Sequence, residues 1–247
     1  MRVAIVPCLK DNFAYLVIEG GVAAVVDPGE AEPVLAAVAR EGVRLAAVWA
    51  THHHMDHVGG LPGLLAAHPG LEVLAGERDA GKIDGVTRAL ADGDEFELAG
   101  VRGRVLHNPG HTLGAITFVI DGRAFTGDTL FGGGCGRVFE GDPAMMHASL
   151  ERLAALPPAT EVYFGHEYTA ANLRFAAAVE PDNADVARRV REIPTPSTPS
   201  TIELERATNP FLRSHVPAVI AAAGARGAAA DGASVFGAIR AWKNDFK

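Results

Sequence analysis

The feature that most constrains this chain is a run of histidines that begins where a buried strand is predicted to end. The apolar segment LAAVWAT (45–51) predicts the strand, and HHHMDH (52–57) follows it directly. The chain has ten histidines in 247 residues, so four of them in one short run need a structural reason. A solvated surface cluster, a tag-like tract and a metal site are the three candidates, and loops at strand ends commonly carry chemistry.

The rest of the first 180 residues alternates between strand and helix patterns. Strands are predicted at 2–7, 14–19, 22–29, 45–51, 71–76, 94–98, 101–107, 114–120, 123–126 and 161–165, and helices at 31–40, 61–68 and 143–155. Several neighbouring strands are close enough in sequence to be linked as hairpins. The pattern therefore favours an α/β (α+β) architecture, with a mixed sheet and helices outside it.

After residue 180 the texture of the sequence changes. Helical patterns dominate from Pro181, and IPTPSTPST (193–201) is a Pro/Ser/Thr connector that cannot be helical throughout. We therefore predict two domains, 1–180 and a smaller helical domain at 181–247.

Composition narrows the class of protein. Hydrophobic residues make up 48% of the chain, which is ample for a buried core, and the formal net charge of −8 disfavours broad attraction to nucleic acid or anionic membranes. No apolar run reaches the ~18 residues that a membrane span needs, and the N-terminus lacks a signal-peptide pattern. Two cysteines are too few for a disulfide framework. We expect a cytoplasmic protein that acts as a monomer.

The spacing within the histidine run suits two metal ions. In an extended segment, residues two apart point to the same side, so His52 and His54 can converge on one ion while His53 points away. Asp56 and His57 come after a bend and could face a second ion. A tag-like or surface tract needs no aspartate at a fixed place.

Three distant segments supply further ligands, each next to a predicted strand and accompanied by glycine: His111 in NPGHTLG (108–114), Asp128 in FTGDTLF (125–131) and His166 in YFGHEYT (163–169). Ligands at strand ends are held where several loops meet. A surface cluster has no need of such partners. Five histidines and two aspartates therefore predict two sets of nitrogen and oxygen ligands.

These motifs carry a family resemblance. THHHMDHVGG resembles the HxHxDH signature of the metallo-β-lactamase superfamily, and VVDPG, NPGHTLG, FTGDTLF and FGHE match its other motifs in order. More narrowly, the chain is similar to the glyoxalase II (hydroxyacylglutathione hydrolase) family along nearly its whole length. PCLKDNFAYLV, FTGDTLFGGGCGR, FGHEYT, TNPFLR and IRAWKNDF all resemble segments of that family. The resemblance implies an αβ/βα metallo-β-lactamase-like sandwich with a smaller C-terminal helical domain.

The resemblance also implies a ligand set for two divalent ions. It places His52, His54 and His111 on one ion, Asp56, His57 and His166 on the other, and Asp128 between both, where it would help to hold a metal-bound hydroxide as the nucleophile. His53 would be a supporting residue, and Asp27 in VVDPG would orient the histidine loop. Imidazole and carboxylate favour zinc, with iron or manganese as alternatives.

Substrate residues follow from the same resemblance. Glutathione carries carboxylates, and the implied binding residues are Arg137, Tyr168, Arg240 and Lys243. The family often has lysine where Arg137 stands and tyrosine where Phe139 stands. Phe139 lacks the tyrosine hydroxyl, which implies somewhat weaker glutathione binding or a different acyl-thiol.

The expected reaction is hydrolysis of S-(2-hydroxyacyl)glutathione, such as S-D-lactoylglutathione, to glutathione and a 2-hydroxy acid. A thiolate leaves more easily than an amine or alkoxide, so this hydrolysis needs no strong general acid. The absence of a GxSxG motif agrees with that. The alternatives are another hydrolase of this fold, acting on other thioesters, lactones, phosphodiesters or β-lactams, and a persulfide dioxygenase with a single iron. A metal-binding structural protein would instead have a closed coordination shell.

Overall fold

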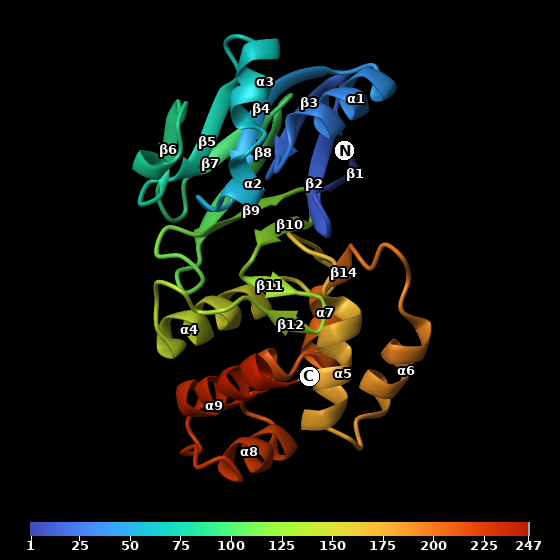
Figure 1. Ribbon diagram of the computed structural model, residues 1–247, viewed down its shortest axis with the longest axis vertical. Coiled ribbons are helices and arrows are strands. Elements are labelled where there is room, and N and C mark those ends of the chain that lie inside the picture. The colour runs from blue at the N-terminus through green and yellow to red at the C-terminus, as the bar shows by residue number, and fades with distance from the viewer. Residues whose placement is uncertain (247) are drawn as a thin grey trace. The chain divides into compact units, whose positions relative to one another are not determined.

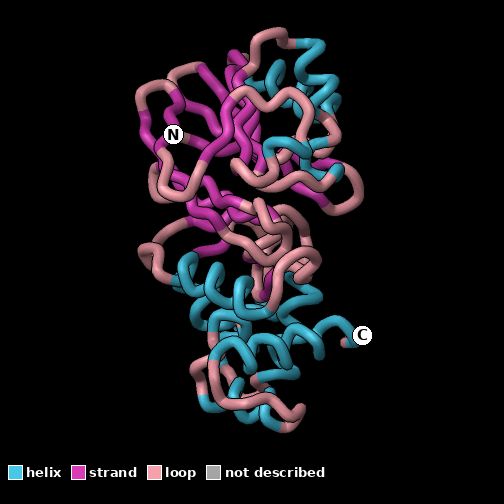
Figure 2. Tube along the Cα trace, turned by 90° about the vertical axis from the view of Figure 1, so that its left-hand side faces the viewer, coloured by secondary structure: helices cyan, strands magenta, loops and turns pink. Residues whose placement is uncertain are grey.

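The computed structural model describes residues 1–246, and its contacts divide the chain into two compact units. Unit 1 comprises Met1–His107 and Thr112–Gly127, and unit 2 comprises Asn108–His111 and the chain from Asp128 onwards. Figures 1 and 2 show that strands dominate the part of the chain that carries the N-terminus and that helices dominate the part that carries the C-terminus.

Unit 1 begins with a six-stranded mixed sheet. Its order is β1 (Arg2–Cys8), β2 (Asn12–Glu19), β3 (Val22–Val26), β4 (Arg44–Ala50), β5 (Glu72–Gly76) and β6 (Arg88–Leu90). The pairs β1–β2 and β2–β3 are antiparallel, and the pairs from β3 to β6 are parallel. The parallel strands place their carboxyl ends at one edge, which is where ligands commonly bind in such sheets.

Helices α1 (Ala31–Glu41) and α3 (Leu61–Ala67) pack against this sheet, and the short helix α2 (Met55–Val58) precedes α3. Helix α1 buries Val34, Ala37 and Val38, the i, i+3, i+4 spacing of one helical face. Gly42 caps its C-terminal end, and the left-handed conformation of this residue (φ +63°) suits a residue without a side chain. A 3₁₀ turn at Ala80–Lys82 follows β5.

The second sheet of unit 1 is antiparallel and contains β7 (Glu95–Leu98), β8 (Val101–His107), β9 (Ile116–Ile120) and β10 (Arg123–Gly127). The fully buried Trp49 of β4 joins the two sheets, because its ring contacts Phe96, Phe118 and Phe125 at centroid distances of 4.8, 5.5 and 6.4 Å. This aromatic layer anchors β4 at Trp49, close to its end and to the histidine run that begins at His52.

Unit 2 contains two short strand pairs and six α-helices among the described residues. The strands are β11 (Leu130–Phe131), β12 (Gly134–Cys135), β13 (Glu161–Phe164) and β14 (Ser200–Thr201). The helices are α4 (Pro143–Ala154), α5 (Thr169–Val179), α6 (Ala184–Glu192), α7 (Ile202–Thr208), α8 (Pro217–Gly224) and α9 (Gly232–Asp245), with a 3₁₀ turn at Pro210–Leu212. None of the helices in the described part of the chain is long and apolar enough to span a bilayer.

An aromatic cluster forms the centre of unit 2. Phe175 of α5 contacts Phe211 at 6.0 Å and Trp242 of α9 at 5.1 Å between ring centroids, and Phe211 contacts Phe236 at 5.7 Å. Helix α5, which lies within the first domain predicted from the sequence, therefore packs with the C-terminal helices. The predicted domain division at residue 180 stays a prediction.

Candidate metal centre

The histidine loop of unit 1 is held by a buried aspartate at the end of the neighbouring strand. Asp27 follows β3, and its carboxylate accepts hydrogen bonds from the main-chain N–H of Thr51 at 2.7 Å and from its hydroxyl at 2.6 Å. Asp27 is 4% exposed and has a left-handed backbone (φ +48°), which is uncommon outside glycine. This conformation aims the carboxylate at the loop that follows β4.

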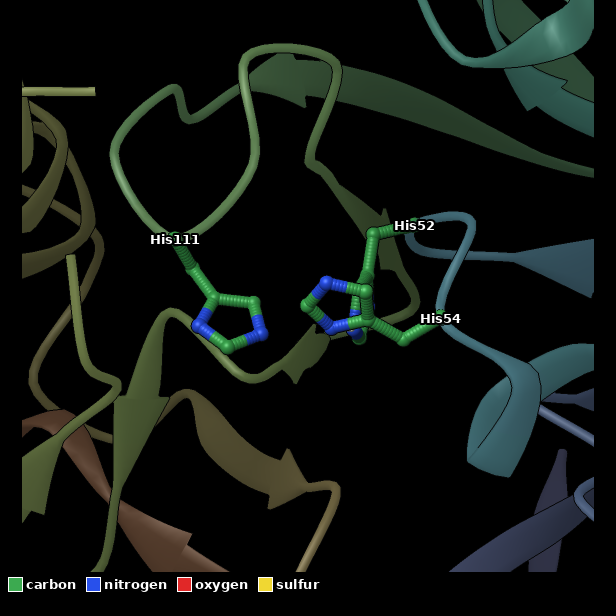
Figure 3. Close-up of side chains that lie close together, drawn as sticks. All are labelled: His52, His54 and His111. Carbon is green, nitrogen blue, oxygen red and sulfur yellow. The ribbon is translucent and has the colours of Figure 1, made fainter. Parts of the chain in front are cut away.

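The same contacts orient the ring of His52. Because the Thr51 hydroxyl donates to Asp27, its oxygen can accept the proton of His52 Nδ1, which lies 3.0 Å away. The lone pair of His52 then resides on Nε2, and Nε2 lies 3.1 Å from His54 Nδ1. Figure 3 shows these two rings next to each other, as the i, i+2 spacing predicted. The figure also labels His111, which belongs to unit 2.

A second pair of ligand atoms lies beside the first in unit 1. His57 Nδ1 lies 3.0 Å from the Asp27 carboxylate, so its Nε2 is the nitrogen that can bind a metal, and Nε2 lies 3.7 Å from the Asp56 carboxylate. The amide of Asn12, at the start of β2, donates to both the side chain and the main-chain oxygen of Asp56 at 3.1 Å. Asp27 and Asn12 thus orient His57 and Asp56.

In unit 2, Asp128 lies between two imidazoles. Its Oδ2 is 3.5 Å from Nε2 of His111 and 3.4 Å from Nε2 of His166. His111 Nδ1 lies 2.9 Å from the carbonyl oxygen of Arg137, to which it donates, so Nε2 of His111 carries the lone pair. All three ligand candidates are at least nine-tenths buried. The assignment of Asp128 to both ions stays a prediction.

Aromatic side chains surround these residues of unit 2. The ring of Tyr168 stacks on His166 at 4.7 Å with an interplanar angle of 4°, and Phe131 meets both rings edge-on. Phe139 lies 5.2 Å from the His111 ring and is 60% exposed. Tyr168 and Phe139 therefore present partly exposed aromatic surface next to two candidate ligands.

Gly136 allows this packing because it has no side chain. A Cβ at this position would lie 1.9 Å from the carbonyl oxygen of Asp128 and 3.1 Å from Nδ1 of His111. We predict that Gly136→Ala displaces Asp128 and destabilises the fold by about 1–3 kcal/mol, the usual cost of overpacking. Metal content and urea unfolding measure the two effects. Gly224→Ala, where a Cβ meets nothing within 4 Å, is the control. Wild-type metal content in Gly136→Ala would contradict the prediction.

The C-terminal helix carries buried and half-buried cations. Arg240 is 8% exposed, and its Nη1 donates to the Cys135 carbonyl at 2.9 Å. Its Nε is buried and has no hydrogen-bond partner among residues 1–246. Burial lowers the pKa of Lys243, and the positive charges of Arg240, Arg174 and Arg137 lower it further. These four side chains repel one another, so an anion bound among them would be stabilised even though the chain has a net charge of −8.

Cys135 is not a nucleophile of this site. Burial raises the pKa of its thiol to about 11 even though Arg240 opposes the shift, so the thiolate is scarce at neutral pH. Both cysteines are buried and unpaired by disulfide.

Four residues near the candidate residues were not predicted as functional: Asn12, Thr51, Arg174 and Asp79, whose carboxylate lies 2.9 Å from Nδ1 of His53. Thr51 and Asn12 lie within segments that had been singled out, but their roles as hydrogen-bond partners depend on contacts between strands. Arg174 lies on α5, which the sequence pattern did not predict. Imidazole and carboxylate, the donor groups of the candidate ligands in each unit, fit divalent transition metals.

Comparison with known proteins identifies two family models along the chain. Residues 10–166 match the metallo-beta-lactamase superfamily, and residues 167–246 match the hydroxyacylglutathione hydrolase C-terminus. The hydroxyacylglutathione hydrolase of Cupriavidus taiwanensis is 51% identical over the whole of both chains. That of Alkalilimnicola ehrlichii is 50% identical, with 98% of each chain covered.

Solved structures show the same fold. TTHA1623 in a di-iron-bound form is 31% identical with a TM-score of 0.63, covering 86% of this chain and 100% of that one. ETHE1 from Myxococcus xanthus is 27% identical with a TM-score of 0.66, covering 85% and 84%. The two family models meet between residues 166 and 167, so the last candidate ligand, His166, closes the first of them.

Proposed function

Since the chain belongs to the hydroxyacylglutathione hydrolases of the metallo-β-lactamase superfamily, we propose that it hydrolyses S-(2-hydroxyacyl)glutathione, with S-D-lactoylglutathione as the substrate. The products are glutathione and a 2-hydroxy acid such as D-lactate. Its fold is that of the superfamily, with mixed sheets and helices and a C-terminal helical region.

The observation that carries the proposal is that Arg137 is next to both a candidate metal ligand and the cations of the C-terminal helix. Its carbonyl oxygen holds the Nδ1 of His111, a candidate metal ligand, at 2.9 Å. Its guanidinium belongs to the group of cations that lowers the pKa of Lys243. One residue of unit 2 thus joins a metal ligand to an anion-binding surface, as a substrate with a reactive thioester and remote carboxylates requires.

The proposed metal ligands are those that the family resemblance implies. We assign His52, His54 and His111 to one ion, Asp56, His57 and His166 to the other, and Asp128 to both. When bound, two divalent ions lower the pKa of a water towards about 7 and take up the negative charge that develops on the substrate carbonyl. Zinc is the proposed metal, because it accepts imidazole and carboxylate together.

The chain's own residues bind the substrate. Arg240, Lys243 and Arg137 neutralise the glutathione carboxylates, and the ring of Tyr168 lies against His166, where it can orient the thiol portion of the substrate. Asp27 keeps the proton of His57 on Nδ1 by direct contact, and that of His52 on Nδ1 through the Thr51 hydroxyl. The departing thiolate needs no strong general acid. Residues 181–247 are the proposed substrate-binding domain.

We also propose a cytoplasmic monomer. Both cysteines are buried thiols with no disulfide among the described residues, which suits a reducing compartment.

The decisive experiment measures hydrolysis of S-D-lactoylglutathione by metal-replete protein, with metal content determined on the same sample. Efficient turnover with close to two metals per chain supports the proposal. Two bound metals without turnover would reject the glutathione substrate, and Phe139 would be the first residue to replace, by tyrosine. Oxygen consumption with glutathione persulfide would point to a dioxygenase instead.

Lys243 predicts a pH dependence of substrate binding. Its pKa is lowered by burial and by the neighbouring cations, so it loses its charge at a lower pH than an ordinary lysine with a pKa of about 10.4. Affinity for an S-alkylglutathione is fully present below that pKa and falls as the pH rises through it. Calorimetric titration from pH 7 to 10 measures the fall.

The control for this prediction is Lys243→Arg, since arginine keeps its charge throughout this range. The amino group of glutathione titrates equally with both proteins, so their difference isolates Lys243. Identical profiles for the two proteins would contradict the assignment of Lys243 to carboxylate binding.

A further inference from the structure

A second buried carboxylate, that of Asp79, contacts the histidine loop of unit 1 and does not belong to the proposed ligand set. Asp79 follows β5 and has 0% exposure. Its Oδ2 lies 2.9 Å from Nδ1 of His53 and accepts a hydrogen bond from the main-chain N–H of His53 at 3.2 Å. His53 is the residue between the two proposed ligands His52 and His54, so Asp79 fixes both the side chain and the backbone of the segment that spaces them.

Asp79 also holds the chain that follows His111. The hydroxyl of Thr112 donates to the same Oδ2 at 3.1 Å. Gly114 approaches so closely that a Cβ there would lie 2.3 Å from Oδ1 of Asp79, and the ammonium of Lys82 lies 3.4 Å from that oxygen. One carboxylate therefore ties together two segments of unit 1 that each adjoin a proposed ligand of the same ion.

Packing alone does not explain a charge at this place. An ionised carboxylate removed from water is costly unless it is paired and hydrogen-bonded, and an apolar side chain would fill the same volume without that cost. The partners of Asp79 converge on it from the histidine loop, from the loop after His111 and from the 3₁₀ turn at Ala80–Lys82. These contacts with Asp79 fix the distance between the loops.

We propose that Asp79 is a positioning residue that holds His52 and His54 at the spacing required to bind a metal ion. The inference rests on the metal centre of the proposed function but not on its substrate. Partners of metal ligands commonly change metal affinity 10–100-fold when they are removed. We therefore expect Asp79→Ala to lower the affinity for the ion assigned to His52, His54 and His111 by about that factor. The affinity for the other ion should change little.

The test titrates metal-free protein with Zn²⁺ and Co²⁺ in competition with a chelator. Asp79→Ala is made in a His57→Ala background, which keeps the ligands of the first ion, and in a His54→Ala background, which keeps those of the second. Affinity should fall about 10–100-fold in the first background only. The Co²⁺ absorption spectrum, which reports coordination geometry, should change there as well.

The matched control is Asp94→Ala, which removes an exposed carboxylate of the same unit that accepts a hydrogen bond from Ala91 in a turn. Asp79→Asn, whose side-chain oxygen can still accept from His53 and Thr112, should recover part of the affinity. Equal affinities, or equal weakening in both backgrounds together with a lower Tm of the metal-free protein, would overturn the proposal.

If Asp79→Ala does not fold, Asp79→Asn is judged by the same selective loss. The outcome is separable from that of the proposed function. A wild-type protein that binds two metals but does not hydrolyse S-D-lactoylglutathione would reject the function and leave the role of Asp79 to be decided by the metal titration alone.

Discussion

Asp128→Ala is expected to abolish turnover of S-D-lactoylglutathione, with a loss in kcat/KM of at least about a thousandfold, which corresponds to about 4 kcal/mol of lost transition-state stabilisation. The reason is that one oxygen of Asp128 faces Nε2 of both His111 and His166, at 3.5 and 3.4 Å. No other carboxylate is assigned to both ions. Steady-state kinetics and metal content of the same preparation measure the effect, and the metal content should fall together with the rate.

One further variant separates the charge of Asp128 from its shape, and a second serves as a control. Asp128→Asn keeps the volume but removes the negative charge, so it should retain the fold while still losing metal. Asp182→Ala removes an exposed carboxylate of unit 2 and should behave as wild type. An Asp128→Ala protein with normal metal content and normal kcat/KM would show that Asp128 is not a ligand.

The candidate ligands were predictable because their signals are local. Each lies at the end of an apolar run, and the alternation of an extended chain already places His52 and His54 together and His53 apart. In the structure His52 and His54 lie 3.1 Å apart between ring nitrogens, and His53 turns to Asp79. Asp56 and His57, which were predicted to follow a bend, lie within the short helix α2 (Met55–Val58).

The features that could not be predicted from the sequence depend on contacts between residues far apart in the chain. Asp79 sits in a polar stretch, GERDAGK, where a carboxylate is ordinary, and only the fold brings Thr112 to it across 33 residues. The β11–β12 hairpin could not be predicted either, because the segment FGGGCG has no alternation of apolar and polar residues and is too short to indicate strands. Its stability comes instead from a glutamate 72 residues away.

That glutamate, Glu205, carries the second large expected effect. It is fully buried in α7, and its carboxylate accepts hydrogen bonds from Arg189 and Ser200 at 2.5 Å, from the main-chain N–H of Gly133 at 2.8 Å and from Asn209 at 3.0 Å. Glu205→Ala leaves the buried Arg189 charge uncompensated. We expect the free energy of unfolding to fall by about 3–5 kcal/mol, as measured by urea denaturation of the metal-free protein.

The loss should also reach the metal centre, because Gly133 lies in the turn of the hairpin that leads from Asp128 to Arg137, whose carbonyl holds His111. Glu205→Ala should therefore bind metal more weakly even at temperatures where it stays folded. Glu203→Ala, an exposed glutamate of the same helix, is the matched control and should change stability by less than about 0.5 kcal/mol. A Glu205→Ala protein as stable as this control would mean that water or a rearranged Arg189 satisfies the charge, and that the hairpin stands without it.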